Sequence, residues 1–369
     1  MRFPEFTGEW KMATFGDIAK GFDYGMNAAA KSFDGNNKYI RITDIDEVSS
    51  QYLYDDVVSP DGELEDRYLV KENDILLART GASTGKSYLY RNSDGKLYFA
   101  GFLIRANIYK HNSYFVFSQL HTLRYKKWIS VMSARSGQPG INSQEYASFP
   151  VYTTSLQEED KIATFLKLLD ERIITQNKII EDLNKLKSAI SECIFNSIKG
   201  DVVMLSEICD IVKGKQINGE YLSESGEYYV MNGGTEPSGY YSEYNVKANT
   251  ISISEGGNSC GYVQFNNFPF WSGGHCYSLQ NIADIVDNLY LYHYLKSKEE
   301  AIMKLRIGSG LPNIQKKDLA MFKTIVPLFE QQITISTFLS SLERKAEIEE
   351  RILNVMQKQK LYLLQQMFI

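Results

Sequence analysis

Ile162-Ala163-Thr164-Phe165-Leu166 recurs as Ile335-Ser336-Thr337-Phe338-Leu339, an offset of 173 residues (162 to 335). The match continues on both sides at the same offset and without a gap. Upstream, Ser136-Gly137-Gln138-Pro139-Gly140-Ile141 corresponds to Ser309-Gly310-Leu311-Pro312-Asn313-Ile314, and downstream Phe195 corresponds to Phe368. A match of this length indicates an internal duplication. The residues ahead of each copy are much less alike, which predicts one shared scaffold that carries two different surfaces.

Each copy of the repeat contains a predicted long helix. Residues 156–197 lack proline and glycine, and Ser155-Leu156-Gln157-Glu158 has the pattern of a capping box. Steps of four and three residues give a coiled-coil seam in both copies. The seams are Ile162, Leu166, Leu169, Ile173, Gln176, Ile180, Leu183, Lys187, Ile190 and Ile194, and Ile335, Leu339, Leu342, Ala346, Glu349, Leu353, Met356, Lys360, Leu363 and Met367.

Polar residues interrupt both seams at the same two steps, which favours packing of the helices against each other over two separate core helices. About 40 residues at ~1.5 Å each give a rod of roughly 60 Å. The first helix leads into the second globular segment and the second helix leaves it, so we expect an antiparallel pair. Each globular segment is then expected at one end of the rod, with an approximate two-fold relation between them. The predicted segments are 1–154, 155–199 (helix), 200–328 and 329–369 (helix).

The two globular segments are predicted to be of the α+β class. Alternating apolar runs bounded by Gly, Asn and Ser predict short strands. Those of the first segment are 38–42, 74–78, 87–90 and 103–106, and those of the second are 228–231, 250–253 and 262–265. A helix is expected at the end of each segment, over 114–132 and 289–305.

Composition places the chain among ordinary globular proteins with two cores. It has 369 residues, of which 43% are apolar and 23% charged. The four cysteines have no C-x-x-C spacing and there are four histidines, so neither a disulfide framework nor a zinc site is indicated. No secretory signal pattern or apolar run of ~20 residues is present. We therefore expect a cytoplasmic protein.

The net charge of −5 argues against a protein that binds DNA unaided, because such proteins usually carry a basic excess. No segment is basic as a whole. Local basic groups do occur ahead of each Ser-Gly loop, and they include Arg135 in the first copy and Arg306 in the second. If the chain contacts DNA, partner proteins are expected to supply much of the attraction to phosphate.

Arg79-Thr80-Gly81-Ala82-Ser83-Thr84-Gly85-Lys86-Ser87 resembles a phosphate-binding loop, but only three residues separate its glycines and a strand pattern follows it. A hairpin between two strands fits better. Its counterpart, residues 254–261, has no lysine. These turns present side chains that suit base edges and phosphates, although solvated turn residues are the simpler interpretation of each. The candidate DNA contacts are Arg41, Arg79, Thr80, Ser83, Thr84, Lys86, Arg105 and Arg135, and Asn232, Asn258, Ser259, His275 and Arg306.

The sequence has no recognisable catalytic constellation: no methyltransferase Asn/Asp-Pro-Pro-Tyr loop, no G-x-S-x-G, no H-E-x-x-H and no nuclease pattern of carboxylates with lysine. The acidic run over 55–66 is interpreted as a solvated face. The chain is therefore expected to be non-catalytic by itself.

With these features together, the chain resembles the specificity subunit of type I restriction-modification systems. The resemblance rests on Arg2-Phe3-Pro4-Glu5-Phe6 with Trp10, on Tyr39-Ile40-Arg41, on Asp74-Ile75-Leu76-Leu77-Ala78-Arg79, and on Leu205-Ser206-Glu207-Ile208. The repeated Ser-Gly loop before Leu328-Phe329-Glu330-Gln331 adds to it. It covers nearly the whole length. The hairpin over 254–261 departs from its counterpart because it lacks basic residues.

The resemblance implies two target recognition domains, each reading one half of a bipartite site in double-stranded DNA. The helices would fix the spacing and dock methyltransferase subunits, and restriction subunits would join through the complex. No cofactor is expected on this chain, because S-adenosylmethionine, ATP and Mg would belong to the partners. Two alternatives stay open: a coiled-coil scaffold with two β-rich domains for ligands other than DNA, which the acidic composition favours, and a phosphate-loop enzyme.

Overall fold

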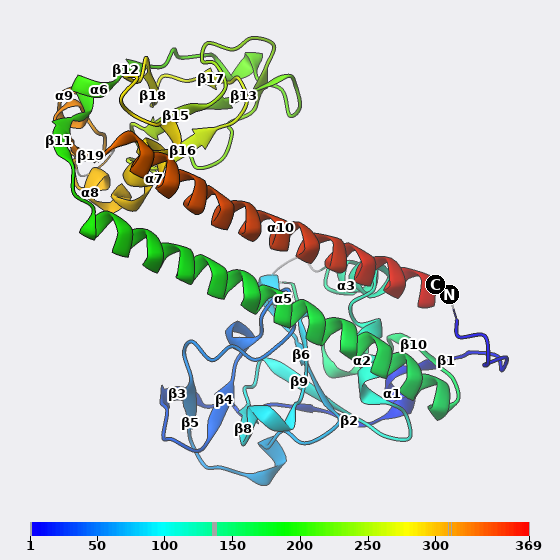
Figure 1. The fold of residues 1–369 in the computed structure, drawn as a ribbon. Helices are drawn as coiled ribbons and strands as arrows, with labels where there is room; N and C mark the ends of the chain where they lie inside the picture. The colour runs from blue at the N-terminus through cyan, green and yellow to red at the C-terminus, as the bar shows by residue number, and fades with distance from the viewer. Residues whose placement is uncertain (1, 135–138, 309, 311, 369) are drawn as a thin grey trace. The chain divides into compact units, whose positions relative to one another are not determined.

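The computed structural model describes residues 2–134, 139–308, 310 and 312–368. The chain divides into two compact units, whose elements Figure 1 colours from blue to red along the sequence. The first unit contains Met1–Lys178 and Arg351–Ile369, and the second contains Ile179–Glu350. Each unit therefore combines a strand-rich region with a part of each long helix.

The first unit is built on a four-stranded antiparallel sheet. Its strands follow the order β2 (Ala19–Tyr24), β9 (Leu103–Ile108), β6 (Asp74–Ala78) and β7 (Ser87–Leu89). Two-stranded pairs accompany it: β1 (Lys11–Thr14) with β10 (Pro150–Thr153), β3 (Ala29–Ser32) with β5 (Val58–Asp61), and, in parallel, β4 (Lys38–Ile40) with β8 (Leu97–Phe99).

Strand β6 is buried on both faces. Ile75 and Leu77 belong to one apolar cluster, and Leu76 and Ala78 belong to another. A strand that is covered on both sides needs no polar face, which explains the continuous apolar run in its sequence. The predicted strand over 38–42 is shorter than expected. It ends at Ile40 because Asp44 accepts hydrogen bonds from the Arg41 backbone and side chain and closes a 3-10 turn, Ile42–Asp44.

The second unit repeats this plan. Its four-stranded sheet has the order β12 (Asp210–Lys213), β18 (Cys276–Gln280), β15 (Thr250–Ser254) and β16 (Val263–Asn266). β11 (Asp201–Met204) pairs with β19 (Lys323–Val326), and β13 (Tyr228–Met231) lies between β14 (Tyr240–Tyr241) and the parallel β17 (Trp271–Ser272). The pair β11–β19 corresponds to the pair β1–β10. Lys11 faces Thr153 in the first unit, and Asp201 faces Val326, the residue 173 positions after Thr153, in the second unit. The repeat seen in the sequence is therefore also present in the structure.

Short helices flank both sheets. The first unit has α1 (Phe15–Ile18), α2 (Ser113–Gln119), α3 (Leu123–Met132) and α4 (Ser143–Ala147), with the 3-10 turns η2 (Asp66–Tyr68), η3 (Gly81–Ser83) and η4 (Asn92–Asp94) besides η1 (Ile42–Asp44). The second unit has α6 (Leu205–Ile208), α7 (Asn288–Ser297), α8 (Glu299–Met303), α9 (Lys316–Ala320) and η5 (Gly219–Tyr221).

The prediction of one continuous helix over 114–132 and another over 289–305 was wrong. The first is broken because the Thr122 hydroxyl donates to Gln119 O (2.7 Å) and accepts from Tyr125 N, which ends α2 and starts α3. The second is interrupted at Lys298, between α7 and α8. Side-chain capping by a threonine inside a helical pattern produces the first of these breaks without proline or glycine.

The two long helices are confirmed as α5 (Leu156–Ser197) and α10 (Phe329–Met367). The expected capping box at the start of α5 is only half present. Glu158 N donates to the Ser155 hydroxyl (3.4 Å), but the Glu158 carboxylate binds Arg2, Trp10 and Thr154 instead of closing the box. This anchors the N-terminal segment to the helix. Among the described residues, no helix is long and apolar enough to cross a membrane.

Within each unit the two helices are antiparallel and share its core. In the first unit, Ile162 and Leu166 near the start of α5 belong to the same cluster as Leu364 near the end of α10. In the second unit the end of α5 joins the start of α10, with Phe195 and Leu339 in one cluster. Every position of both predicted seams is buried or half-buried.

The lysine that interrupts each seam forms an ion pair between the helices. In the first unit Lys360 Nζ lies 2.5 Å from Asp170 Oδ1, and in the second unit Lys187 Nζ lies 3.5 Å from Glu343 Oε1. The two pairs are equivalent in the repeat, because Lys187 corresponds to Lys360 and Asp170 corresponds to Glu343 at the offset of 173 residues. The lysine lies on α10 in the first pair and on α5 in the second. A tyrosine donates to each acid, Tyr114 to Asp170 (2.5 Å) and Tyr292 to Glu343 (3.3 Å). Such pairs fix the register and direction of a helix pair.

Replacing Lys360 by Met is expected to lower the free energy of unfolding of the first unit by about 1–2 kcal/mol, because Asp170 is left half-buried without its cation. Lys358, exposed on the same helix, supplies the control: Lys358→Met should change stability by less than about 0.5 kcal/mol. Thermal unfolding followed by circular dichroism measures the difference. Equal melting temperatures for the two variants would show that the ion pair contributes no stability.

Candidate nucleic-acid interface

The loop between β6 and β7 is held tightly by backbone hydrogen bonds. Gly81 N donates to Pro139 O (2.9 Å), and Ile141 N donates to Arg79 O (2.9 Å), so the hairpin is tied to the Ser-Gly loop. Gly85 adopts φ +94°, and a Cβ there would lie 2.9 Å from Ile129 side-chain atoms. Because a strand follows the loop, as predicted, it lacks the helix N-terminus that a phosphate-binding loop requires.

The hairpin between β15 and β16 is held in the same way. Gly257 N donates to Pro312 O (3.1 Å), and Ile314 N donates to Glu255 O (2.8 Å). Gly261 also has a positive φ of +94° and lies against Met303, as Gly85 lies against Ile129. Arg79 and Glu255 therefore occupy the same place on the two scaffolds.

Strand register identifies two more equivalent positions. Tyr24 faces Ile104 at the end of β2, and Lys213 faces Tyr277 at the end of β12. Arg79 N donates to Phe102 O (3.1 Å), just as Glu255 N donates to His275 O (2.9 Å). We call Tyr24, Arg79 and Phe102 the first trio, and Lys213, Glu255 and His275 the second trio.

The first trio combines one cation with two aromatic rings. The Arg79 Cζ lies 4.9 Å from the centre of the Tyr24 ring. The Tyr24 hydroxyl accepts from Ser143 N (3.2 Å), and this hydrogen bond, with the nearby Arg79 charge, lowers the pKa of the Tyr24 phenol. Phe102 is 60% exposed. All three residues line a cavity of about 640 Å³, which Arg41 and Thr43 also line.

The second trio has a buried acid at its centre. Glu255 is 7% exposed, and its Oε1 lies 2.6 Å from Lys213 Nζ and accepts from the Tyr277 hydroxyl (3.0 Å). His275 Nδ1 lies 3.7 Å from Oε2. Burial, followed by the hydrogen bond to Glu255, raises the pKa of Tyr277. Glu255 thus orients two exposed groups, and the basic residue missing from this hairpin is supplied by β12.

Three of the cations predicted to contact DNA in the first segment have acidic partners. Arg41 Nη2 lies 2.7 Å from Asp44 Oδ1 and 3.0 Å from Asp56 Oδ2, and hydrogen bonding to Asp44 raises the pKa of Arg41. Lys86 Nζ lies 3.6 Å from Glu47 Oε2, and Arg105 Nη2 lies 2.7 Å from Asp23 Oδ2. Their attraction for phosphate is correspondingly reduced.

The polar side chains of the loops that were predicted to contact DNA differ in how exposed they are and in whether they already have a hydrogen-bond partner. Thr84 uses its hydroxyl within the loop, donating to Gly81 O (2.7 Å), whereas Thr80 and Ser83 are half-buried beside it. In the second unit Asn258 and Arg306 are exposed, Ser259 is half-buried, and Asn232 Oδ1 accepts from His275 N (3.1 Å). Arg135 lies outside the described residues.

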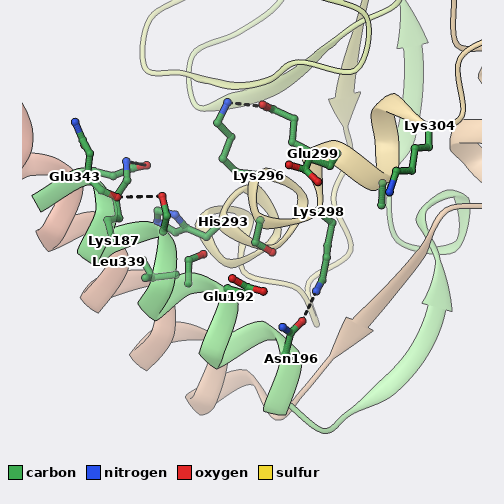
Figure 2. A pocket seen from close by; sticks show the side chains of 16 residues that line it. Lys187, Glu192, Asn196, His293, Lys296, Lys298, Glu299, Lys304, Leu339 and Glu343 are labelled. Atoms are coloured by element: carbon green, nitrogen blue, oxygen red, sulfur yellow. Dashed lines mark hydrogen bonds and ion pairs between the residues drawn. The ribbon is translucent and has the colours of Figure 1, made fainter. Parts of the chain in front are cut away.

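A different pocket in the second unit, of about 750 Å³, is lined by three basic residues ahead of the second Ser-Gly loop: Lys296, Lys298 and Lys304. Lys296 Nζ donates to Glu299 Oε2 (2.6 Å), and Lys298 Nζ donates to Asn196 Oδ1 (2.8 Å). Lys187 forms its ion pair with Glu343 in the same pocket (Figure 2). His293 contacts Ser340 (Nε2 to Oγ, 2.9 Å), and burial lowers its pKa. Because Lys187, Lys296 and Lys298 already have partners, this pocket is a weaker candidate for DNA than the first trio.

Sequence reasoning missed Tyr24, Phe102 and Lys213. The offset of 173 aligns Phe102 with His275. This difference between an aromatic residue and a histidine at equivalent positions of the repeat could have identified Phe102 as a candidate from the sequence. Tyr24 and Lys213 are 189 residues apart (24 to 213), and their equivalence follows only from strand register.

A duplicated α+β domain, with unlike side chains at equivalent positions and a long helix after each copy, defines a protein with two similar but not identical domains. The model of the family described as type I restriction modification DNA specificity domain matches residues 7–185 and again 199–358. The chain belongs to this family.

Individual relatives agree with this assignment. A putative type I specificity subunit of Mycoplasma pneumoniae is 33% identical over 156 residues, which is 42% of this chain and 41% of the relative. A similar match in Mycoplasma genitalium covers 32% of that protein, so the chain spans less than half the length of these two relatives. The type I restriction enzyme MjaVIII specificity subunit of Methanocaldococcus jannaschii is 23% identical, with 95% of this chain and 89% of the relative covered.

The fold also matches a solved structure over its whole length. The crystal structure of the type I restriction-modification S subunit from M. genitalium has a TM-score of 0.70 at 18% identity, with 98% of this chain and 96% of that chain covered. At this identity the likeness shows the fold alone.

Proposed function

We propose that this chain is the DNA-recognition subunit of a type I restriction-modification complex, in which each domain reads one half of a bipartite site. The observation that carries the proposal is the pair of trios: one backbone scaffold presents Tyr24, Arg79 and Phe102 in one domain and Lys213, Glu255 and His275 in the other. Two copies with the same frame and different exposed chemistry suit a site with two unlike halves.

In this proposal α5 and α10 set the distance between the half-sites and dock methyltransferase subunits, which restriction subunits join. The chain contributes recognition rather than chemistry. S-adenosylmethionine, ATP and Mg are assigned to the partner subunits. Because the complex acts on cellular DNA, we place the chain in the cytoplasm.

The alternative is a scaffold whose two domains bind ligands other than DNA. The net charge of −5 and the acidic partners of Arg41, Lys86 and Arg105 favour it. Membership of the family favours DNA. Binding measurements on the chain with and without methyltransferase subunits separate the two possibilities.

We expect the isolated chain to bind a duplex containing the methylated site weakly, with a dependence of log K on log [salt] shallower than about −3, since each neutralised phosphate contributes roughly −0.9. Methyltransferase subunits should strengthen binding and steepen this slope. Gel shifts at several salt concentrations measure both quantities, with a scrambled duplex as control. Nanomolar, site-specific binding by the chain alone at physiological salt would contradict the expectation, and no site preference with partners would support the alternative.

A further inference from the structure

Among the cations predicted to contact DNA in the first domain, Arg79 differs from its described neighbours. Arg41, Lys86 and Arg105 each lie within 4 Å of a carboxylate, at 2.7, 3.6 and 2.7 Å. The described residues place no carboxylate at that distance from Arg79, and its Nε is buried without a hydrogen-bond partner among them. The charge of Arg79 is therefore available to a ligand.

The position of Arg79 is fixed before any ligand binds. Its backbone amide donates to Phe102 O (3.1 Å) and its carbonyl accepts from Ile141 N (2.9 Å). Its guanidinium lies against the Tyr24 ring, and the Tyr24 hydroxyl is held by Ser143 N. A planar guanidinium stacked on an aromatic ring is pre-organised, so it loses little conformational freedom when it forms paired hydrogen bonds.

The surroundings of Arg79 suit a base edge better than a phosphate alone. Phe102 is 60% exposed and Tyr24 is 42% exposed beside the same cavity of about 640 Å³. Apolar rings at the rim can contact a base or a thymine methyl group, whereas a phosphate site gains nothing from them. The two parallel N–H groups of arginine match O6 and N7 of guanine, which is the commonest specific contact in the major groove.

We propose that Arg79 is the specificity-determining residue of the first domain and reads the guanine of one G·C pair in the major groove. The inference rests on the proposed function and deepens it. The second domain has Glu255 at the equivalent position, buried and bound to Lys213 and Tyr277, so this guanine contact belongs to one half-site only. Arg79 touches the base directly, and Tyr24 is its positioning residue.

The test uses the complex of the full chain with its methyltransferase subunits and a duplex that carries the site mapped by methylation sequencing. Each guanine is replaced in turn by 7-deazaguanine, which lacks the N7 acceptor. For the unmodified complex we expect affinity to fall by about 10- to 100-fold at one guanine of one half-site. For Arg79→Met, which keeps a long unbranched side chain but has no hydrogen-bond donor, the same replacement should cost less than about 3-fold, because the contact with guanine is already lost.

Arg306→Met is the matched control: it makes the same exchange at an exposed arginine of the second domain and should leave the response of that guanine unchanged. If Arg79→Met prevents assembly, Tyr24→Leu is used instead, which removes the stacking ring and keeps Arg79. It should weaken the 7-deazaguanine effect at the same guanine.

Several outcomes overturn the inference. One is a site in which the half read by the first domain has no G·C pair. A second is that the Arg79→Met complex keeps the full loss of affinity at every 7-deazaguanine position. A third is a uniform loss of affinity on all sequences in Arg79→Ala, with the salt slope reduced by about 1, which identifies a phosphate contact. These outcomes can be distinguished from failure of the proposed function. In that case even the complex without substitutions would bind the mapped site no more tightly than a scrambled duplex.

Discussion

Exchanging residues 200–328 for the equivalent domain of a relative with another specificity changes one half of the methylated site and leaves the other half unchanged. Methylation at the original site should fall by at least about 10³-fold, the lower end of the ratio between specific and non-specific binding. The reason is that the second trio lies within the exchanged segment and the first trio lies outside it. Sequencing of methylated DNA from cells that carry the hybrid chain measures the result.

The structure indicates where such an exchange is tolerated. Strands β11 and β19 pair with each other and both lie inside 200–328, so no strand pair is cut. The segment does pack on the helices, because Phe195 and Leu339 belong to its core cluster. The donor should therefore have apolar residues of similar size at these positions. A hybrid with the native segment re-inserted is the control, and a change in both half-sites together would contradict the assignment of one reader to each domain.

Adding seven residues to each long helix should increase the preferred spacer between half-sites by about three base pairs while both half-sites stay the same. Seven residues keep the heptad register and lengthen a helix by about 10 Å. With 34–36 Å for about 10–10.5 base pairs, this corresponds to about three base pairs and roughly a quarter-turn around the DNA.

The insertion points follow from the compact units. One insertion lies between Lys178 and Ile179 in α5 and the other between Glu350 and Arg351 in α10, so the ion pairs Asp170–Lys360 and Lys187–Glu343 each stay within one unit. Insertion into α5 alone is the control and should reduce assembly, because unpaired apolar residues would face water. Methylation of substrates that differ only in spacer length gives the optimum. An unchanged optimum in an active complex would refute the role of the helices as spacers.

The duplication, the long helices and the hairpins could be predicted because each is encoded by residues near one another in sequence. The continuous apolar run over 75–78 and the seam positions are local patterns of this kind. The breaks at Thr122 and Lys298 were missed because they depend on side-chain capping and local geometry within an otherwise helical pattern. Helix propensity alone does not describe the competition between side-chain hydrogen bonds to the backbone and the hydrogen bonds of a continuous helix.

The candidate site was harder to predict because it depends on partners that are distant in sequence. Lys86 and Arg105 are cations like Arg79, yet Glu47 and Asp23 from other segments pair with them; Arg41 has a local partner, Asp44, in addition to the more distant Asp56. Tyr24 and Lys213 reach the equivalent position through strand pairing, with an offset that differs from the 173 of the repeat. Lys213 also brings an ammonium group beside Glu255, although the second hairpin itself has no basic residue.

The central claim is that one scaffold carries two unlike readers, and sequencing of all methylated sites made by the intact complex tests it most directly. The account predicts a bipartite motif with two different half-sites separated by a spacer of fixed length and no sequence preference, with a G·C pair in the half that the first domain reads. A continuous motif, or two identical half-sites arranged as a palindrome, would contradict it.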